Sequence, residues 1–515
     1  MHPREHARTS PDKPACIMAK SGELLTYRQL DEASNRTAHL LRRAGLRAGD
    51  MVGVMMHNCL TFLEVTWAAQ RSGLYYVSIP SSVSERELHY ILSDSGARAL
   101  LYSSDLDAVA RAATESLPHV KRYPAGDAAR PDSLERATET LPSDPIADEE
   151  PGQDMVYSSG TTGNPKGIKH PRPTGGISEL TGVSKLAHGL YGMGPRSVYL
   201  CPAPLYHAAP LRFSMAAVQL GGTVVIMEKF DPEEALAAIE RYRVTHAQWV
   251  PTHFVRMLKL PPSVRERYDM SSLVSTFHAA APCPSEIKQQ MIDWWGPIVH
   301  EYYGSSELNG LTAATAQEWL SRKGTVGRAV MGTIHICDEA GEPVPPRTEG
   351  AIYFSDATPI EYHNDPEKTR QAANQYGWTT VGDVGWVDEE GYLYLTDRRS
   401  FMIISGGVNI YPQEIENLLI EHPAVADAAV IGAPDADLGE RVVAVVQPMD
   451  WSAAGDALAR ELDSYLRANL SPVKIPKQID FLRELPRQPT GKLFKRLLRD
   501  SYRNAESGET AAAAR

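Results

Sequence analysis

Apolar positions in the first part of the chain follow two alternating patterns, and each pattern predicts a different element. After Thr26, the apolar residues Leu30 and Leu41 lie at helical intervals in a stretch that ends at Gly45. Threonine is a good N-cap, and glycine commonly follows the last turn of a helix. The stretch therefore predicts a helix that begins after Thr26 and ends near Gly45. A second stretch of this kind occupies residues 61–73.

Short apolar runs between such stretches predict buried strands. Helices that alternate with short apolar strands indicate an α/β layer structure with much parallel sheet, because the crossover helices cover the faces of such a sheet. Residues 118–150 are instead rich in Pro, Asp and Glu, and we expect surface connections there. The apolar runs occupy residues 51–56, 74–80, 98–104, 197–203, 222–228, 245–251 and 273–280.

The pattern changes twice in the second half of the chain. From about residue 325, short alternating runs separated by turns, such as GTIHICDEAGEPVPP and GAIYFS, predict antiparallel strands. From about residue 400, the runs EIENLLIEHP, VADAAVIGAP and ERVVAVVQP predict a compact α+β part, and residues 504–515 are typical of a frayed tail. The chain has 515 residues, which is too long for one ordinary domain, so we expect at least two.

The composition mainly excludes certain classes of binding partner. Hydrophobic residues make up 43% of the chain and charged residues 23%, as in ordinary globular proteins, and the net charge is −12 without a long basic run. We therefore expect neither nucleic acid nor an anionic membrane surface as a partner. The five cysteines are widely spaced and match no metal-binding pattern, which is typical of reduced, buried thiols. Neither a signal peptide nor a membrane-spanning run is visible, and we expect a cytoplasmic protein.

One glycine-rich stretch carries candidate chemistry. YSSGTTGNPKG, residues 157–167, combines hydroxyls, glycines and a lysine, which are the groups that bind a polyphosphate. It lacks the spacing of the common nucleotide-binding loop, because Pro165 stands where that loop has its second glycine. Alone, such a stretch is more often a flexible linker, so its meaning depends on the motifs that accompany it.

Further motifs follow this stretch in a fixed order. They are YYGSSE at 302–307, TTVGDVGWVDEEGYLYLTDRRS at 379–400, IISGGVNIYPQEIE at 403–416 and PRQPTGKLFKRLLR at 486–499. Together with the glycine-rich stretch, they resemble the adenylate-forming superfamily, which includes acyl-CoA and aryl-CoA synthetases, peptide adenylation domains and firefly luciferase. The resemblance covers nearly the whole chain. It implies an α/β multidomain fold, with a large N-terminal domain of layered α/β subdomains plus a β-barrel-like part, and a small mobile α+β C-terminal domain.

The resemblance implies a ligase reaction in two steps. A carboxylate attacks the α-phosphate of ATP and pyrophosphate leaves; a thiol then displaces AMP from the acyl adenylate. Two anions meet in the first step, so the site must supply positive charge and hydrogen-bond donors where negative charge develops. The implied cofactors are ATP, Mg²⁺ and CoA.

The same resemblance assigns the phosphates to the glycine-rich stretch and the adenine to YYGSSE. Tyr303 would contact adenine, Ser306 would lie near the α-phosphate, and Glu307 would hold Mg²⁺, a hard cation that favours carboxylate oxygens. The residues implied to bind ATP or AMP in these two stretches are Ser158, Ser159, Gly160, Thr161, Thr162, Gly163, Lys166, Tyr303, Gly304, Ser305 and Ser306.

Other implied nucleotide contacts come from HAAAPCP, residues 278–284, and from the 379–400 stretch. The family usually has glycines where Ala279 and Ala280 stand, which predicts a reshaped pocket wall. Asp383 matches a carboxylate that binds both ribose hydroxyls, and Arg398 matches an arginine that also reaches the ribose. The implied contacts are Ala280, Ala281, Pro282, Asp383 and Arg398.

The resemblance also implies a C-terminal domain that moves. It places an AMP-binding domain at residues 1–397, a hinge at 398–401, the mobile domain at 402–502 and a flexible tail at 503–515. Ser400 stands where the family commonly has Asp or Lys, and serine tolerates the change in backbone dihedral angles that a hinge needs.

Each step has its own implied residues in this C-terminal part. Lys492 would be catalytic in the first step, where it contacts the carboxylate and the α-phosphate. A turn with two glycines would line the pantetheine arm of CoA in the second step, because glycine leaves room for a narrow ligand. Lys495 and Arg496 are expected to be surface charges. The residues of the turn are Ser405, Gly406 and Gly407.

The acyl group is the least specified part of the prediction. His207 matches a gate over the carboxylate and is a candidate catalytic residue. No aspartate stands where peptide adenylation domains bind an amino group, which favours a plain organic acid, either fatty, aryl or bulky polycyclic and terpenoid. The implied acyl pocket comprises Tyr206, His207, Trp249, Pro251, His253, Phe254, His278 and Met331.

Three functions stay open at this point. We favour an acyl-CoA synthetase, a monomer or homodimer, because no carrier-protein serine motif is visible. The second is an acyl-AMP ligase that loads the phosphopantetheine of a carrier protein. The third is a non-catalytic nucleotide sensor or scaffold, which would be expected to lose Lys492 or Glu307; both are present.

Overall fold

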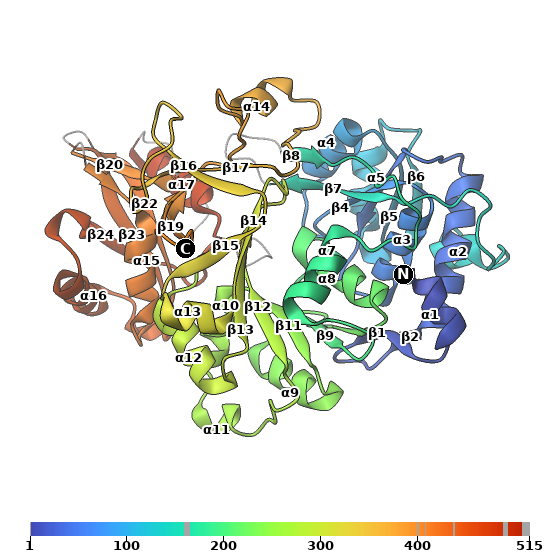
Figure 1. The fold of residues 1–515 in the computed structure, drawn as a ribbon, viewed down its shortest axis with the longest axis horizontal. Coiled ribbons are helices and arrows are strands. Elements are labelled where there is room, and N and C mark those ends of the chain that lie inside the picture. The colour runs from blue at the N-terminus through green and yellow to red at the C-terminus, as the bar shows by residue number, and fades with distance from the viewer. Residues whose placement is uncertain are drawn as a thin grey trace. The chain divides into compact units, whose positions relative to one another are not determined.

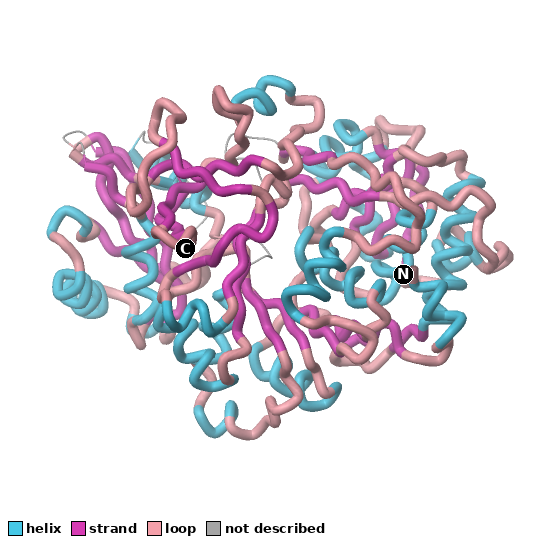
Figure 2. Tube along the Cα trace, viewed as in Figure 1, coloured by secondary structure: helices cyan, strands magenta, loops and turns pink. Residues whose placement is uncertain are grey.

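A computed structural model describes residues 2–158, 165–398, 401–406, 408–435, 438–487 and 493–506. The chain divides into two compact units. Unit 1 comprises residues 1–248, 262–276 and 360–371, and unit 2 comprises 249–261, 277–359 and 372–515. Figure 1 labels the helices and strands along the chain, and Figure 2 shows that both kinds of element occur throughout it.

Unit 1 is built on parallel sheet. One sheet has the strand order β6-β5-β3-β4-β7-β8, in which every neighbouring pair is parallel except β7 and β8. Strands β11, β9, β10 and β1 also pair in parallel, and β2 pairs antiparallel with β1. The strands are β1 (Pro14–Met18), β2 (Leu24–Thr26), β3 (Met51–Met55), β4 (Tyr75–Ser78), β5 (Ala97–Ser103), β6 (Lys121–Ala125), β7 (Gln153–Ser158), β8 (Lys166–Lys169), β9 (Val198–Cys201), β10 (Thr223–Ile226) and β11 (His246–Trp249).

Helices connect these strands, as the alternating pattern predicts. The helix predicted after Thr26 is α2, and its N-terminus has a capping box in which Thr26 and Gln29 each bond to the backbone of the other. The helices of unit 1 are α1 (Pro3–Thr9), α2 (Tyr27–Arg43), α3 (Leu60–Arg71), α4 (Glu85–Ser95), α5 (Asp107–Thr114), α6 (Leu134–Thr138), α7 (Gly182–Tyr191), α8 (Ala208–Gln219), α9 (Pro232–Tyr242), α11 (Pro262–Arg265) and α14 (Pro366–Gln371).

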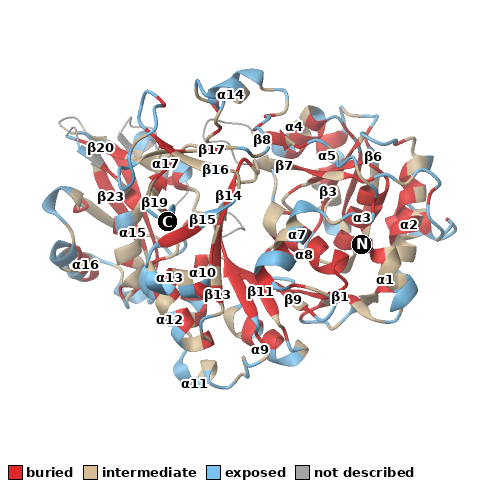
Figure 3. Ribbon diagram, viewed as in Figure 1, coloured by how far each residue is buried: buried red, intermediate tan, exposed pale blue. Residues whose placement is uncertain are grey.

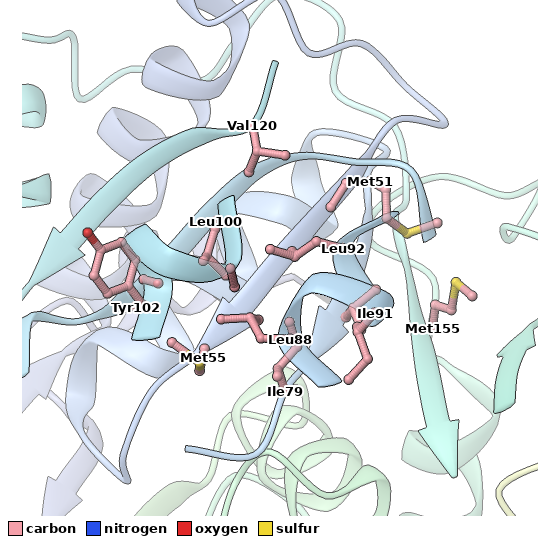
Figure 4. Close-up of a cluster of buried hydrophobic side chains, with 14 of the residues drawn as sticks. Met51, Met55, Ile79, Leu88, Ile91, Leu92, Leu100, Tyr102, Val120 and Met155 are labelled. Atoms are coloured by element: carbon pink, nitrogen blue, oxygen red, sulfur yellow. The ribbon is translucent and has the colours of Figure 1, made fainter. Parts of the chain in front are cut away.

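The core of the first sheet lies between strands β3 and β5 and the helices α4 and α5. All residues of β3 are buried, which agrees with the continuous apolar run in its sequence. Figure 4 shows Met55, Leu88, Leu92 and Leu100 together in this core. In Figure 3 the strands are largely in the colour of buried residues, whereas exposed residues gather on helices and loops.

Unit 2 contains the antiparallel part that the sequence predicts after residue 325. Its strands pair antiparallel in the order β16-β17-β18-β19-β15-β14-β13. The strands are β12 (Ser275–His278), β13 (Val299–Gly304), β14 (Leu311–Ala314), β15 (Thr325–Met331), β16 (Thr333–Cys337), β17 (Gly350–Ser355), β18 (Asp383–Val387) and β19 (Leu393–Arg398), and the helices are α10 (Pro251–Leu258), α12 (Ser285–Trp295) and α13 (Ala316–Ser321).

The last part of unit 2 is the predicted α+β part. Its sheet has the order β21-β20-β23-β22, and β24 adds to β23 in parallel. Ile403, Ile415 and Leu462 belong to its buried core. Its elements are β20 (Ile403–Ser405), β21 (Val408–Ile410), α15 (Pro412–Glu421), β22 (Val425–Asp435), β23 (Gly439–Pro448), α16 (Asp456–Asn469), β24 (Gln478–Phe481) and α17 (Lys495–Glu506).

Three expectations from the sequence need correction. Residues 118–150 are not only connections, because β6 pairs with β5 and α6 follows it. An edge strand has a partner on one side only and tolerates polar residues and proline, which hides it in the sequence. Lys495 is not a surface charge, because it is 6% exposed. The helix α17 continues to Glu506, so residues 504–506 belong to a helix and not to the expected tail.

Most of the cysteines are buried, as their sequence pattern predicts. All five cysteines are free, and Cys16, Cys201 and Cys337 are buried. Burial raises the pKa of Cys16 to about 12, so its thiol stays protonated at neutral pH. Among the helices of the described segments, none is both long enough and apolar enough to cross a bilayer.

Candidate active site

The glycine-rich stretch is bounded by the hairpin strands β7 and β8 of unit 1. Ser158 at the end of β7 pairs with Lys166 at the start of β8. Both ends of the stretch are therefore held at one edge of the sheet. Lys166 is half-buried. The predicted phosphate contacts Ser159, Gly160, Thr161, Thr162 and Gly163 lie outside the described residues.

A single residue of α4, Asp94, anchors the base of this hairpin. The hydroxyl of Tyr157 donates to the Asp94 carboxylate at 2.6 Å, and the Asn364 side chain donates to the Asp94 backbone carbonyl at 3.1 Å. The ring of His363 donates to the same carbonyl at 3.0 Å. Burial, followed by the hydrogen bond to Asp94, raises the pKa of Tyr157, so the phenol stays a donor. Sequence reasoning missed Asp94, because no motif contains it.

His207, the predicted gate residue, precedes α8 in unit 1. Its ring centroid lies 4.6 Å from that of Tyr206. Burial lowers the pKa of His207 to about 3, so its imidazole is neutral at physiological pH. Its Nε2 atom is buried and has no hydrogen-bond partner among the described residues. A neutral ring with a free nitrogen suits a contact with a ligand oxygen.

A cavity elsewhere in unit 1 contains none of the predicted site residues. Its volume is about 500 Å³, and α2, α3 and α6 contribute to its lining. Glu64 lines it, and burial raises the pKa of that carboxyl to about 7. The predicted site residues therefore lie outside this cavity.

In unit 2, the structure brings together two residues that the sequence separates widely. Tyr303 lies at the end of β13 and Asp383 at the start of β18. The Tyr303 hydroxyl donates to the Asp383 carboxylate at 2.7 Å. Asp383 is buried, and across the β18–β19 pair it lies opposite Arg398. The residues predicted to contact adenine and ribose thus lie side by side.

We expect Tyr303→Phe to raise the KM for ATP by about three- to tenfold with kcat little changed, because it removes a hydrogen bond to a charged acceptor. The ring and its packing remain. Steady-state kinetics at varied ATP measure the effect. Tyr376→Phe is the matched control, since that exposed hydroxyl donates to Glu342 at 2.6 Å in the same unit. Equal effects of the two variants would contradict the assignment of Tyr303.

The predicted adenine-lining segment adopts the backbone that glycine would favour. Ala280 has a φ of 76°, in the left-handed region that residues with a Cβ avoid. An alanine therefore adopts here a backbone conformation that glycine permits more readily. The Ala279 amide donates to the backbone carbonyl of Trp249 at 3.3 Å, and Ala280 and Pro282 are exposed. The segment therefore stores backbone strain at a surface position.

We expect Ala280→Gly to stabilise the protein slightly, by about 0.5–1 kcal/mol, because relief of left-handed strain outweighs the added freedom of the unfolded chain. Ala279→Gly is the matched control. That residue is buried and is not among the residues with positive φ, so glycine there should destabilise the protein. Thermal unfolding compares the variants. If both substitutions lowered the melting temperature equally, the strain at Ala280 would be refuted.

The turn after Tyr303 presents the predicted metal ligand. Ser305 donates to the Asn309 side chain at 3.0 Å, and Asn309 donates to the backbone carbonyl of Thr379 at 3.2 Å. These bonds fix the turn that contains the half-buried Glu307. The described residues contain no group of three or more ligands for a metal. A single carboxylate nevertheless fits Mg²⁺ that is held mainly by nucleotide phosphates.

Aromatic residues predicted for the acyl pocket form one cluster in unit 2. The centroid of the Trp249 ring lies 6.0 Å from the ring centroid of His253, 6.3 Å from that of Phe254 and 5.5 Å from that of Trp295. Burial lowers the pKa of His253 to about 3, so this histidine is neutral. Sequence reasoning missed Trp295, although two adjacent tryptophans, Trp294 and Trp295, are conspicuous in the sequence of α12. Met331 ends β15 and is half-buried.

His278 belongs to a buried polar cluster behind the Ala279–Pro282 segment. Its ring lies 5.5 Å from Phe254, and its Nε2 is 3.4 Å from the carboxylate of Glu301. Lys288 forms a buried ion pair with Glu301 at 2.6 Å. Burial and the Lys288 charge lower the pKa of His278, which keeps the ring neutral. Sequence reasoning did not select Lys288 and Glu301 as site residues, because only the fold brings these two side chains together.

The predicted pantetheine turn lies between β20 and β21. Ser405 pairs with Val408 across this hairpin, and Gly406 has a φ of 57°. Gly407, Ser400 and Lys492 lie outside the described residues. The chain on either side of Lys492 is joined by an antiparallel bridge between Arg487 and Leu493.

Comparison with known proteins identifies the family. The model of the AMP-binding enzyme family matches residues 3–359, and that of the AMP-binding enzyme C-terminal domain matches residues 414–492. The chain belongs to the AMP-binding enzyme family. The predicted resemblance to the adenylate-forming superfamily, with a large N-terminal and a small C-terminal domain, is therefore confirmed.

Relatives of this AMP-binding enzyme act on different acids. It is 34% identical to a feruloyl-CoA synthase of Amycolatopsis sp. over 96% of each chain. It is 31% identical to the long-chain-fatty-acid–CoA ligase FadD13 of Mycobacterium tuberculosis over 97% of each chain. The ATP-bound structure of MatB from Rhodopseudomonas palustris has a TM-score of 0.83 at 26% identity and covers 98% of this chain and 100% of its own. The chain is thus an acid–thiol ligase by family.

Proposed function

We propose that this enzyme activates an organic carboxylic acid to an acyl adenylate and then transfers the acyl group to CoA. The observation that carries the proposal is the match of both family domains in order, together with the hydrogen bond from Tyr303 to Asp383. ATP, Mg²⁺ and CoA are the cofactors of this reaction.

The proposed roles follow the chemistry of each side chain. The buried Asp383 accepts from the ribose hydroxyls while Tyr303, bonded to it, presents its ring to the adenine. Glu307 holds Mg²⁺ against the phosphates, and Lys166 adds positive charge near the leaving pyrophosphate. Lys492 neutralises charge where the carboxylate and the α-phosphate react.

The remaining proposed nucleotide contacts form two groups. Hydroxyl and backbone donors of the glycine-rich stretch bind the β- and γ-phosphates, and backbone atoms of the Ala280–Pro282 segment lie against the adenine. Arg398 assists Asp383 at the ribose, and Ser305 and Ser306 lie near the α-phosphate. The hydroxyl and backbone donors belong to Ser158, Ser159, Gly160, Thr161, Thr162 and Gly163.

The proposed acid carries no charge other than its carboxylate. Burial keeps His207 and His253 neutral, so neither offers a charge to a second ionised group on the substrate. The cluster of Trp249, Phe254 and Trp295 is aromatic and buried. Apolar and aromatic surroundings of this kind favour a fatty, aryl or bulky polycyclic acid. The names of the relatives, which include feruloyl and long-chain fatty acids, fall in this class.

The proposed domain alternation separates the two steps. We place the hinge at residues 398–401 and the moving domain at 402–502; Ser405, Gly406 and Gly407 then serve the CoA step only. A cytoplasmic location and a monomeric or homodimeric state remain predictions from the sequence.

A panel of acids tests the proposal directly. The enzyme is incubated with ATP, Mg²⁺ and ferulate, a long-chain fatty acid, a polycyclic acid or a dicarboxylic acid, with and without CoA. Mass spectrometry then detects acyl-AMP and acyl-CoA. For at least one acid that carries no charge besides its carboxylate, we expect acyl-AMP in the absence of CoA and acyl-CoA in its presence. For the dicarboxylic acid we expect neither product. Acyl-AMP that is never converted by CoA would point to a carrier-protein acceptor, and no acyl-AMP with any acid would refute the proposal.

A further inference from the structure

The connection of residues 279–284 joins β12 to α12 and carries Ala280. Strand β12 ends at His278, and α12 begins at Ser285. Ala280 is exposed and has a φ of 76°. A residue with a Cβ stays in this conformation only where the surrounding structure holds it there. The start of α12 offers little local support, because its N-cap residue, Pro284, makes no side-chain hydrogen bond.

Glu301 of β13 meets both ends of this connection with a single oxygen atom. His278, the residue directly before the connection, has its Nε2 atom 3.4 Å from Oε2 of Glu301. Lys288, in the first turn of α12, has its Nζ atom 2.6 Å from the same oxygen. One carboxylate therefore contacts both the strand that precedes the connection and the helix that follows it.

The three side chains of this contact are buried. Those of His278 and Lys288 are 0% exposed, and that of Glu301 is 7% exposed. The Lys288 ammonium also lies 4.9 Å from the centroid of the Trp319 ring, within the range of a cation–π contact. A buried ion pair contributes little to net stability, because desolvation offsets the attraction. The geometry that the pair imposes is therefore the better reason for its presence.

Strand β13 also carries the tyrosine that is proposed to contact adenine. Glu301 and Tyr303 are two residues apart in this strand, so their side chains leave it on the same face. The Tyr303 hydroxyl donates to Asp383 at 2.7 Å. The contacts of Glu301 thus attach the 279–284 connection to the strand that presents Tyr303.

We propose that Glu301 is a positioning residue of the adenine site: through His278 and Lys288 it holds both ends of the 279–284 connection against β13, and so fixes Ala280 relative to Tyr303. The inference rests on the proposed function, which assigns Ala280 and Tyr303 to the adenine. It gives His278 a role other than the acyl contact that the family resemblance implies. Because other elements are proposed to bind the phosphates, loss of these contacts weakens binding of the base and spares binding of the phosphates.

A neutral double variant of the full-length enzyme tests this role. Lys288→Met with Glu301→Gln removes both charges, so neither is left buried and unpaired. Titration calorimetry without any acid substrate measures the Kd for ATP and for pyrophosphate, each with Mg²⁺. We expect the Kd for ATP to rise about tenfold, the size of one lost hydrogen bond, and that for pyrophosphate to change less than about twofold. The matched control is Lys495→Met with Glu416→Gln, which neutralises an equally buried pair in the same unit and should keep the wild-type Kd for both ligands.

Adding Ala280→Gly to the double variant separates positioning from a general loss of stability. Glycine adopts the left-handed conformation without strain, so the connection no longer needs to be held at both ends. We expect the triple variant to regain an ATP affinity within about threefold of the wild type. Melting curves of all variants show whether each one is folded at the temperature of the titration.

The outcomes are distinct. Equal weakening of ATP and pyrophosphate binding, or the same loss of ATP affinity in the control, would overturn the inference. A triple variant without recovery would show that the pair does not hold Ala280, and would overturn it as well. A wild-type enzyme that binds ATP but forms no acyl-AMP with any acid would refute the proposed function, while the ATP titrations would still decide the role of Glu301.

Discussion

Lys492→Ala is expected to slow acyl-AMP formation by about 100- to 1000-fold, the size of the loss when one preorganised donor to a developing negative charge is removed. Formation of acyl-CoA from supplied acyl-AMP should stay nearly unchanged. The reason is that two anions meet only in the first step, and the ammonium of Lys492 is the group assigned to neutralise them. Pyrophosphate release measures the first step, and mass detection of acyl-CoA measures the second.

Lys477→Ala is the control for charge loss in the same part of the chain. Lys477 is exposed, and its backbone amide rather than its ammonium bonds to Val442. We expect both half-reactions of this variant to match the wild type. A Lys492 variant that loses both half-reactions to the same extent would contradict its assignment to the first step.

Gly407→Leu should have the opposite effect, with acyl-AMP accumulating and acyl-CoA formation falling by about 100-fold or more, as for a reacting group displaced from its productive position. Its neighbour Gly406 already has a φ of 57°, and a Cβ added there would meet Leu438 at 3.3 Å. A bulky side chain in this turn would obstruct the narrow thiol arm of CoA. Because the obstruction is steric, Gly407→Ala should be milder than Gly407→Leu.

Gly391→Leu controls for strain without obstruction. Gly391 lies in another turn of unit 2, has a φ of 81° and has no atom within 4 Å of an added Cβ. We expect this variant to lose stability and to keep the ratio of acyl-CoA to acyl-AMP. Melting curves must accompany both assays. If Gly407→Leu abolished pyrophosphate release and kept the CoA step, the assignment of the two steps would be wrong.

Elements governed by neighbours in the sequence were predictable. The helix α2 begins where Thr26 and Gln29 cap each other, an interaction between residues three positions apart. The strand β3 is buried along its whole length, as its unbroken apolar run indicates. The family was also readable from the order of its motifs, and the AMP-binding match confirms it.

Other features depend on partners far along the chain. The contact between Tyr303 and Asp383 joins residues 80 positions apart, and the Arg487–Asp427 pair spans 60. The strand β6 looked like a connection, because its composition does not reveal that it pairs with β5. Residues 360–371 belong to unit 1, although the chain on both sides of them belongs to unit 2.

The sequence by itself determined the family, the alternation of helices and strands, and which residue types could serve phosphate, ribose and metal. Only the tertiary structure decided that Ala280 keeps a left-handed backbone without glycine, and that Lys495 is buried rather than solvated. The physical reason is the range of the interactions. Caps and apolar periodicity act over a few residues and leave a local signature, whereas a buried charge is stable only beside a partner such as Glu416 that the fold brings to it.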